Sequence, residues 1–395
     1  MKDKLDVLIE GARVHDGRGF IDHPTRVGIL GERVVFLDTG EPAAAHEVID
    51  ASGLILAPAL IDIHNHADRR ILSRVGANLL AQGIGTVIVG NCGFSPWGQC
   101  GQHTVFLDDS DSHQEFRNAE DYFHAFRQAK SPIDVFSLAG LQSLLPMDGI
   151  SERLQASIEA GCIGLSVGLN YDIQNAVTES DLISLGKSLS KYRDIWGGIC
   201  WHMRNQAEGL IESVSEVVRV HLASGVPCHI SHLKRAGVEK ADEIDIVLDM
   251  IAPHAGISAD MYTYVEGWTT LSFLIGAGRE RLGQAASLEE AALEACRQFC
   301  PNRWDDVVLA SGVDEEYLGR SVKEISLMRG EEELATYIGL VSLYPDATAC
   351  YMNQSHPSNV KKVLTFERGL VGSDGHIYDV GERGHHPRSF GTFAR

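Results

Sequence analysis

The sequence has no excess of basic residues and no basic cluster. It carries 34 Lys and Arg against 54 Asp and Glu, which gives a formal net charge of −20 at pH 7. A chain this acidic repels phosphate backbones and acidic membrane surfaces. The composition therefore predicts neither nucleic acid nor a membrane as a partner.

Long hydrophobic runs and paired cysteines are also missing. Residues 53–61 form an apolar run that is far too short to cross a bilayer, and Asp6 and Glu10 interrupt the apolar residues at the start. The eight cysteines are scattered without a CxxC pair, several of them inside apolar runs, which is typical of buried free thiols. We expect a cytoplasmic protein without a disulfide framework.

The length and an early change of pattern indicate two domains. The chain has 395 residues, more than the roughly 250 at which a single core stops growing. Its first 50 residues alternate short β-rich stretches with turn residues, which predicts a small antiparallel sheet with strands at 5–10, 25–30, 33–38 and 46–49. We expect a small β-sheet domain over 1–56 and a larger domain over 57–395.

The larger domain has the pattern of a TIM-type (β/α)8 barrel, an α/β fold. Apolar runs of strand length alternate with amphipathic segments of helix length, such as 205–223. The strand candidates number eight, which is the number that closes such a barrel: 56–63, 85–90, 133–139, 162–168, 197–202, 226–232, 256–262 and 369–373. Residues 276–357 contain helical patterns and no clear barrel strand, so they are expected to form an excursion between the last two strands.

Metal-binding side chains gather where these strands end. His64 and His66 are two residues apart on the first barrel strand, so both rings point into the barrel mouth, although a structural pair would show the same spacing. His202, His232 and Asp374 lie at or just past the ends of three other strands. Barrel enzymes place their active sites at these ends, and imidazoles with a carboxylate suit catalytic Zn²⁺.

The chain resembles the amidohydrolase superfamily and, within it, the N-acyl-D-amino-acid deacylases, or D-aminoacylases. Several motifs carry the resemblance, in matching order and approximate spacing over most of the chain. They are residues 57–66 with Asp68, 82–83, 90–95, 164–171, 202–204, 230–234, 260–264, 372–375 and 386–393.

The resemblance implies a zinc site that is built around a cysteine. Many amidohydrolases join two metal positions through a carbamylated Lys on the fourth strand, but residues 162–168 contain no Lys. Cys92 matches the cysteine that does this in the D-aminoacylases, and thiolate is a strong zinc ligand. By resemblance, one tightly bound zinc has the ligands Cys92, His202 and His232. A weaker second position is framed by His64, His66 and Asp374, with Cys92 as the bridge.

The resemblance also assigns the proton shuttle and the substrate contacts. Asp374 is expected to take a proton from a metal-bound water, the nucleophile, and to deliver it to the leaving amine. Arg388 matches the position that binds the substrate carboxylate, Lys234 and Tyr171 match further substrate contacts, and Tyr264 is a candidate donor to the oxyanion. Without the resemblance, the two basic residues could equally well be surface charges, and the two tyrosines could equally well be packed aromatics.

The sequence departs from the family in two respects. It ends shortly after the eighth strand, where family members continue with a last barrel helix and further strands, so we expect a homo-oligomer or a separate chain that covers this face. Asn205 stands where an acidic residue is common, and Trp268, Thr269 and Thr270 replace small residues near the pocket. These changes leave the acyl and side-chain specificity open.

The leading hypothesis is zinc-dependent hydrolysis of an N-acyl-D-amino acid to a carboxylate and a D-amino acid. One alternative is a cyclic amide or imide hydrolase of the hydantoinase type, which the barrel favours and the missing Lys disfavours. Another is a catalytically silent subunit of a split amidohydrolase, against which the complete set of metal-binding residues argues.

Overall fold

The computed structural model describes residues 4–23, 25–98, 116–171, 174, 176–237, 240–378 and 386–395. The chain divides into two compact units, Met1–Leu60 and Ile61–Arg395. All residues of the candidate site lie in the second unit.

The first unit is built on a sheet with the strand order β4-β3-β1-β5. Its strands are β1 (Leu5–Glu10), β3 (Thr25–Leu30), β4 (Arg33–Asp38) and β5 (Ala45–Asp50). The expected sheet is present, but it is not wholly antiparallel, because β5 pairs parallel to β1. The short strands β2 (Arg13–Val14) and β6 (Ile55–Leu56) pair beside it, and Leu5, Leu8 and Leu37 form its core.

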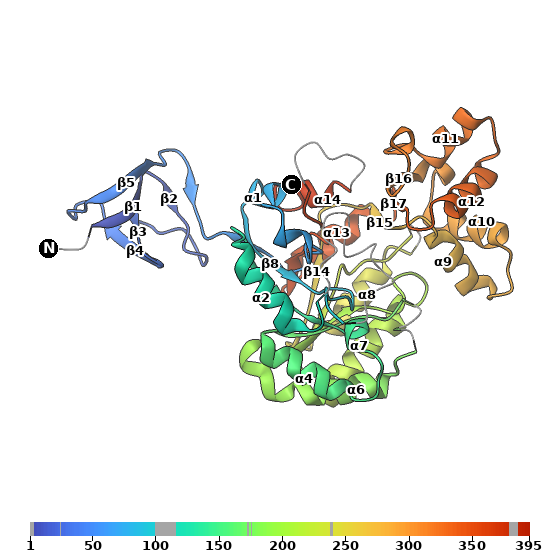
Figure 1. Cartoon of the computed structure of the whole chain (residues 1–395), viewed down its shortest axis with the longest axis horizontal. Coiled ribbons are helices and arrows are strands. Elements are labelled where there is room, and N and C mark those ends of the chain that lie inside the picture. The colour runs from blue at the N-terminus through green and yellow to red at the C-terminus, as the bar shows by residue number, and fades with distance from the viewer. Residues whose placement is uncertain are drawn as a thin grey trace. The chain divides into compact units, whose positions relative to one another are not determined.

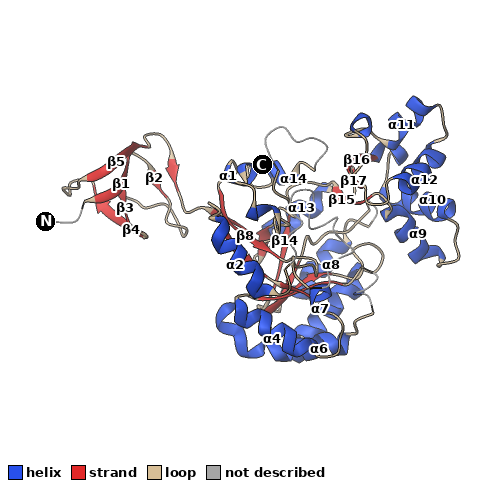
Figure 2. Cartoon of the chain, in the orientation of Figure 1, coloured by secondary structure: helices blue, strands red, loops and turns tan. Residues whose placement is uncertain are grey.

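The second unit contains the predicted (β/α)8 barrel (Figures 1 and 2). Its parallel strands run in the orders β7-β8-β9 and β10-β11-β12-β13-β14-β18. A parallel bridge between Asn65 and Gly375 joins the ends of the first and last strands. The strands are β7 (Leu60–Asp62), β8 (Ile84–Val89), β9 (Asp134–Ser137) with its continuation β10 (Ala139–Gly140), β11 (Gly164–Gly168), β12 (Gly198–His202), β13 (Cys228–Ile230), β14 (Ile257–Met261) and β18 (Gly369–Val371).

Amphipathic helices surround these strands and bury their apolar faces against them. The larger ones are α2 (Ala119–Ala129), α4 (Ile150–Ala160), α6 (Glu179–Leu189), α7 (Leu210–Ser224), α8 (Glu243–Ile251) and α13 (Pro357–Thr365); α1 (Ala77–Leu80), α3 (Leu141–Leu144) and α14 (Arg388–Gly391) are single turns. Helix α7 begins later than the expected start at residue 205. The Asn205 carboxamide accepts the backbone N–H groups of Ala207 and Gly209, which holds a loop there instead.

The excursion lies between β14 and β18, as expected, and it begins at β15 rather than at residue 276. It contains α9 (Phe273–Leu282), α10 (Leu288–Phe299), α11 (Val322–Arg329) and α12 (Glu333–Leu343). The sequence did not indicate its small antiparallel sheet, ordered β15-β17-β16, because the strands are short and buried: β15 (Gly267–Thr270), β16 (Val307–Ser311) and β17 (Thr348–Tyr351). These elements lie together (Figure 1), and they supply most members of one apolar cluster, which also includes Ala207 and Ala236.

Candidate active site

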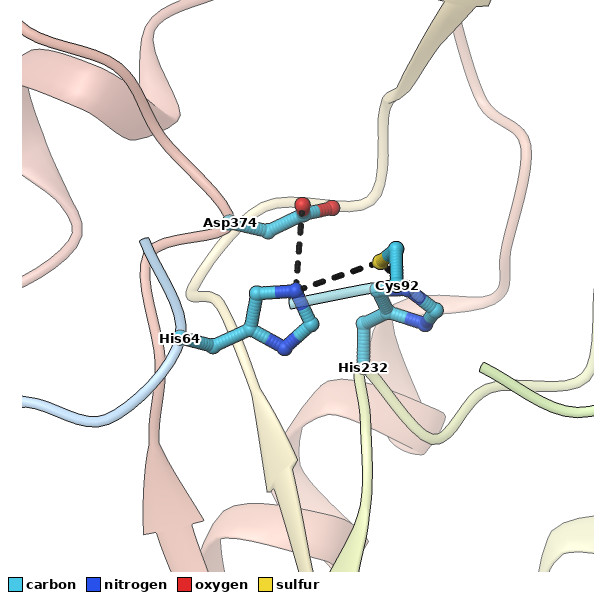
Figure 3. Close-up of side chains that lie close together, drawn as sticks. All are labelled: His64, Cys92, His232 and Asp374. Carbon is cyan, nitrogen blue, oxygen red and sulfur yellow. Dashed lines mark hydrogen bonds and ion pairs between the residues drawn. The ribbon is translucent and has the colours of Figure 1, made fainter. Parts of the chain in front are cut away.

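Side chains from four strand ends meet at the carboxyl end of the barrel. His64 follows β7, Cys92 follows β8, His232 follows β13 and Asp374 follows β18. One ligand atom from each lies within 4.8 Å of the others, and all four residues are buried (Figure 3). The structure thus brings together residues that are more than 300 positions apart in sequence, at the end of the barrel where catalytic groups lie.

The distances around Cys92 are within about 0.3 Å of those in a tetrahedral zinc site. Its Sγ lies 3.4 Å from Nδ1 of His202 and 3.7 Å from Nε2 of His232, and these two nitrogens are 3.0 Å apart. Bond lengths of about 2.0–2.1 Å for Zn–N and 2.3 Å for Zn–S place the ligand atoms of a tetrahedral site roughly 3.3–3.6 Å apart. The geometry and chemistry of these three groups therefore fit Zn²⁺.

A second group of donors lies on the other side of the same sulfur. His64 Nε2 is 3.5 Å from Cys92 Sγ and 3.5 Å from Asp374 Oδ1. His66 Nε2 is 3.1 Å from the same carboxylate oxygen. Cys92 is therefore placed between the two donor groups, as a bridging ligand has to be.

The environment of Cys92 favours its thiolate form. Burial opposes ionisation, but the imidazoles of His202 and His64 hold the pKa of this thiol well below its usual range. Burial instead raises the pKa of Cys162 and Cys200. The cysteines that the structure describes are all free and buried, and Cys92 is the one among them that lies in the metal-binding cluster.

Three residues of the cluster have a backbone conformation that L-residues rarely adopt. The φ angles are 54° for Cys92, 37° for His232 and 50° for Asp374. Such conformations cost free energy and persist where the surrounding structure enforces them, often at active sites. The backbone at Cys92 also lies close to Gly168. A side chain at position 168 would not fit, because its Cβ would lie 2.1 Å from the Cys92 carbonyl oxygen. The fold therefore holds these three residues in unfavourable backbone conformations, which lowers the free energy of unfolding.

Asp260 supports the cluster through contacts with its imidazoles and backbone. The motif that contains this residue carried no assigned role for it. Its carboxylate is fully buried and lies 3.2 Å from Nδ1 of His64 and 2.8 Å from Nε2 of His229. It also accepts the backbone N–H of His232 at 2.8 Å. A carboxylate on the far nitrogen of a metal-binding imidazole fixes its tautomer and orientation. The available signal was a lone carboxylate in an otherwise apolar strand, β14.

Asp62 joins the two strands that close the barrel. Its buried carboxylate accepts the backbone N–H of Ser373 and the side-chain N–H of Asn65, both at 2.8 Å. The residues on either side of these partners are His64, His66 and Asp374. Asp62 therefore fixes the relative positions of the two segments that supply the second donor group, a role that sequence analysis did not find.

An open cavity lies above the cluster. Tyr171, Lys234 and Arg388, all expected to contact substrate, line it. Tyr262 also lines it, whereas Tyr264 is not among its lining residues. By the period-two alternation of β14, Tyr262 shares the inward face with Asp260, whereas the chain has turned by residue 264.

Arg388 has a partner that its expected role did not include. Its guanidinium Nη1 lies 2.5 Å from Oδ2 of Asp374, and both residues are buried. Burial opposes ionisation of Asp374, but Arg388 and His66 hold the pKa of this carboxyl well below its usual range. Asp374 is therefore a carboxylate at neutral pH.

Comparisons with known proteins agree with this site. No family model matches the chain. It is 28% identical to D-aminoacylase of Alcaligenes xylosoxydans xylosoxydans, over 99% of this chain and 78% of that protein. It is 27% identical to N-acyl-D-glutamate deacylase of the same organism, over 100% of this chain and 78% of that protein.

Solved structures show the same fold. The N-acyl-D-glutamate deacylase of Bordetella bronchiseptica, complexed with zinc and a phosphonate inhibitor, superposes with a TM-score of 0.80 at 24% identity, covering 100% of this chain and 80% of that one. A crystal structure of D-aminoacylase gives a TM-score of 0.79 at 24% identity, covering 99% of this chain and 80% of that one.

The barrel and its thiolate, imidazole and carboxylate donors are those of a metal-dependent amide hydrolase. Over its whole length the chain is similar to the D-aminoacylase and the N-acyl-D-glutamate deacylase named above. The resemblance found in the motifs is confirmed. None of the helices described combines the length and apolar character that a membrane span requires.

Proposed function

We propose that this protein hydrolyses the amide bond of N-acyl-D-amino acids and releases a carboxylate and a D-amino acid. The observation that carries the proposal is the position of Cys92, whose sulfur lies between His202 and His232 on one side and His64 on the other. Similarity over the whole chain to enzymes named for this activity supports it.

Cys92, His202 and His232 would hold a tightly bound zinc, and His64, His66 and Asp374 would share Cys92 at a weaker position. Zinc bound there supplies two effects, a lowered pKa of water and polarisation of the scissile carbonyl. Gln206 orients one of the ligands, since its amide nitrogen lies 2.9 Å from Nδ1 of His232, which leaves Nε2 facing Cys92.

Asp374 moves the proton in this proposal. As a carboxylate it accepts a proton from the attacking water and then donates it to the nitrogen of the leaving amine. Arg388 positions this carboxylate through Oδ2, while Oδ1 faces His64 and His66. The two oxygens of Asp374 therefore have different neighbours, and the proton is exchanged on the side of the donor cluster.

Lys234 is the candidate for binding the substrate carboxylate, whereas Arg388, to which the resemblance gave this role, is paired with Asp374. Both line the cavity, and the Lys234 ammonium lies 5.3 Å from the centre of the Tyr262 ring. The Tyr262 hydroxyl is buried and has no hydrogen-bond partner within the described part of the chain. A buried donor without a partner is costly, so a substrate oxygen is its natural acceptor. Tyr262 therefore replaces Tyr264 as the candidate oxyanion donor.

The test is a screen of the zinc-loaded protein against paired N-acetyl-D- and N-acetyl-L-amino acids and a hydantoin. Release of free D-amino acids with a preference for the D-series supports the proposal. Ring opening of the hydantoin without cleavage of the linear amides would overturn it in favour of the cyclic amide alternative. The expected homo-oligomer or separate covering chain stays a prediction.

A further inference from the structure

A network of hydrogen bonds leads from strand β13 to the weaker metal position. Ser258 Oγ lies 2.8 Å from Nδ1 of His229, and Nε2 of His229 lies 2.8 Å from Oδ2 of Asp260. The same carboxylate oxygen lies 3.2 Å from Nδ1 of His64. We call these four residues the His229 network. It ends on a proposed metal ligand, and it contains an imidazole that the proposed function does not use.

The strand ladder explains why these side chains meet. Ser258 is the register partner of His229 between the parallel strands β13 and β14. Asp260 lies two residues further along β14, so its side chain is on the same face of that strand as Ser258. A Cβ on Gly372, just after β18, would lie 2.6 Å from Cβ of His64 and 3.0 Å from the carboxyl carbon of Asp260. The glycine therefore leaves the space in which the carboxylate reaches the imidazole.

The hydrogen bonds of the network have one consistent direction. A carboxylate only accepts, so His64 and His229 both donate to Asp260. His64 then carries its proton on Nδ1 and keeps the lone pair of Nε2 for a metal. A neutral His229 donates from Nε2, so its Nδ1 accepts the hydroxyl of Ser258. Ser258 therefore selects the tautomer of His229 that Asp260 requires.

The two oxygens of Asp260 contact different metal positions. Oδ1 accepts the backbone N–H of His232, a ligand of the tight position, at 2.8 Å. Oδ2 contacts His64, a ligand of the weaker position, and is the oxygen that His229 holds. His229 is 6% exposed and Asp260 is fully buried, so bulk water does not replace a bond lost between them. Loss of His229 therefore affects Oδ2 and leaves the bond at Oδ1 in place.

Resting on the ligand sets of the proposed function, we propose that His229 is a positioning residue for the weaker metal position. It holds Oδ2 of Asp260, and Asp260 in turn holds the ring of His64 with Nε2 facing Cys92. The tight position does not depend on His229, because the contact of Asp260 with His232 uses the other oxygen.

The experiment measures zinc binding to chelator-treated protein in competition with a chelator and follows the first and second equivalents separately. We expect His229→Leu to lower the affinity for the second equivalent by about 10- to 100-fold, the usual effect of losing an outer partner of a ligand, and to change the first little. His229→Gln should recover most of this loss, because its amide nitrogen can still donate to Asp260. An unchanged second equivalent in His229→Leu would overturn the proposal, as would an equal loss at both equivalents.

Two further variants separate positioning from packing. Ser258→Ala removes only the hydroxyl that directs the tautomer of His229, and it should weaken the second equivalent by a smaller factor. His221→Leu removes an imidazole from α7, whose Nδ1 lies 2.7 Å from the Val226 carbonyl oxygen, and should change neither equivalent. Circular dichroism checks each fold. If His229→Leu does not fold, Ser258→Ala decides: a weakened second equivalent supports the proposal, and an unchanged one overturns it.

Metal binding is measured without substrate, so the proposal and the proposed function fail differently. Two equivalents with the expected differences, but no hydrolysis of any N-acyl-D-amino acid, would contradict the proposed function alone. Hydrolysis with equal second equivalents in the wild type and His229→Leu would contradict the role of His229 alone. A wild-type protein that binds a single equivalent at every zinc concentration would also overturn the proposal, because there would be no second position for His229 to support.

Discussion

The guanidinium of Arg388 and the carboxylate of Asp374 form a buried ion pair with an N–O distance of 2.5 Å, next to the proposed zinc ligands. Arg388 is further enclosed by aromatic rings, with its charge centre 5.0 Å from the ring centre of Tyr262 and 5.6 Å from that of Trp268. Planar stacking and a fixed hydrogen-bonding fork are properties of Arg that Lys lacks. The arginine therefore holds the carboxylate of Asp374 in one orientation.

Replacement of Arg388 by Lys should lower kcat for every substrate. The charge remains, but the fork that fixes Asp374 is lost, and a hydrogen bond between charged groups contributes about 1.5–3 kcal/mol. We expect the same fractional loss for an N-acetyl-D-amino acid and for its methyl ester, because the lost contact is to Asp374. A loss confined to the free acid would show that Arg388 acts on the substrate carboxylate instead.

Replacement of Lys234 by Met should have the opposite pattern. Met keeps most of the length of the side chain and removes its charge from the cavity wall. We expect KM for the free acid to rise by about 10- to 100-fold, in line with a charged contact of 1.5–3 kcal/mol, and KM for the methyl ester to change little. Steady-state kinetics on both substrates measure this. An equal rise for acid and ester would contradict the role of Lys234 in charge recognition.

Replacement of Cys92 by Ala should remove the tightly bound zinc and leave the fold largely intact. A site with three protein ligands that loses its thiolate loses much of its metal affinity. Cys162→Ala is the matched control, because it removes a buried thiol from the barrel outside the cluster. Elemental analysis should find zinc in the control and little in Cys92→Ala. Equal zinc in both would make Cys92 a packing residue.

Replacement of Asp260 by Asn should weaken metal binding without removing any ligand. Asn keeps the size of the side chain but no longer balances the charge beside His64 and His229. Loss of such an outer partner typically reduces metal affinity or activity by 10- to 100-fold. Competition with a zinc chelator measures the affinity, and circular dichroism checks the fold. An unchanged affinity would show that Asp260 serves the packing of β14 alone.

The barrel strands and the donor residues were predictable from the sequence, and the reason is geometric. Period-two alternation places His64 and His66 on one face, and parallel strands bring their carboxyl ends to one edge, so residues that follow different strands meet there. Cys92 was identified through the resemblance, because the sequence around a cysteine does not show which side chains surround its thiol in the folded protein.

The remaining features depend on tertiary contacts that no local pattern encodes. The pairing of Arg388 with Asp374 and the support from Asp260 join side chains whose positions only the closed barrel fixes. Tyr264 and Tyr262 have the same phase in the alternation of β14, so the sequence could not show that only Tyr262 lines the cavity. The sheet of the excursion was missed because its strands are too short to show a period.

The most direct test of the account is the hydrolysis of N-acetyl-D-leucine by chelator-treated protein as zinc is added back. The account predicts no turnover without metal, recovery as zinc binds, and no recovery in Cys92→Ala at the same zinc concentration. Full turnover in metal-free protein, or full recovery in Cys92→Ala, would contradict a zinc-dependent hydrolase centred on Cys92.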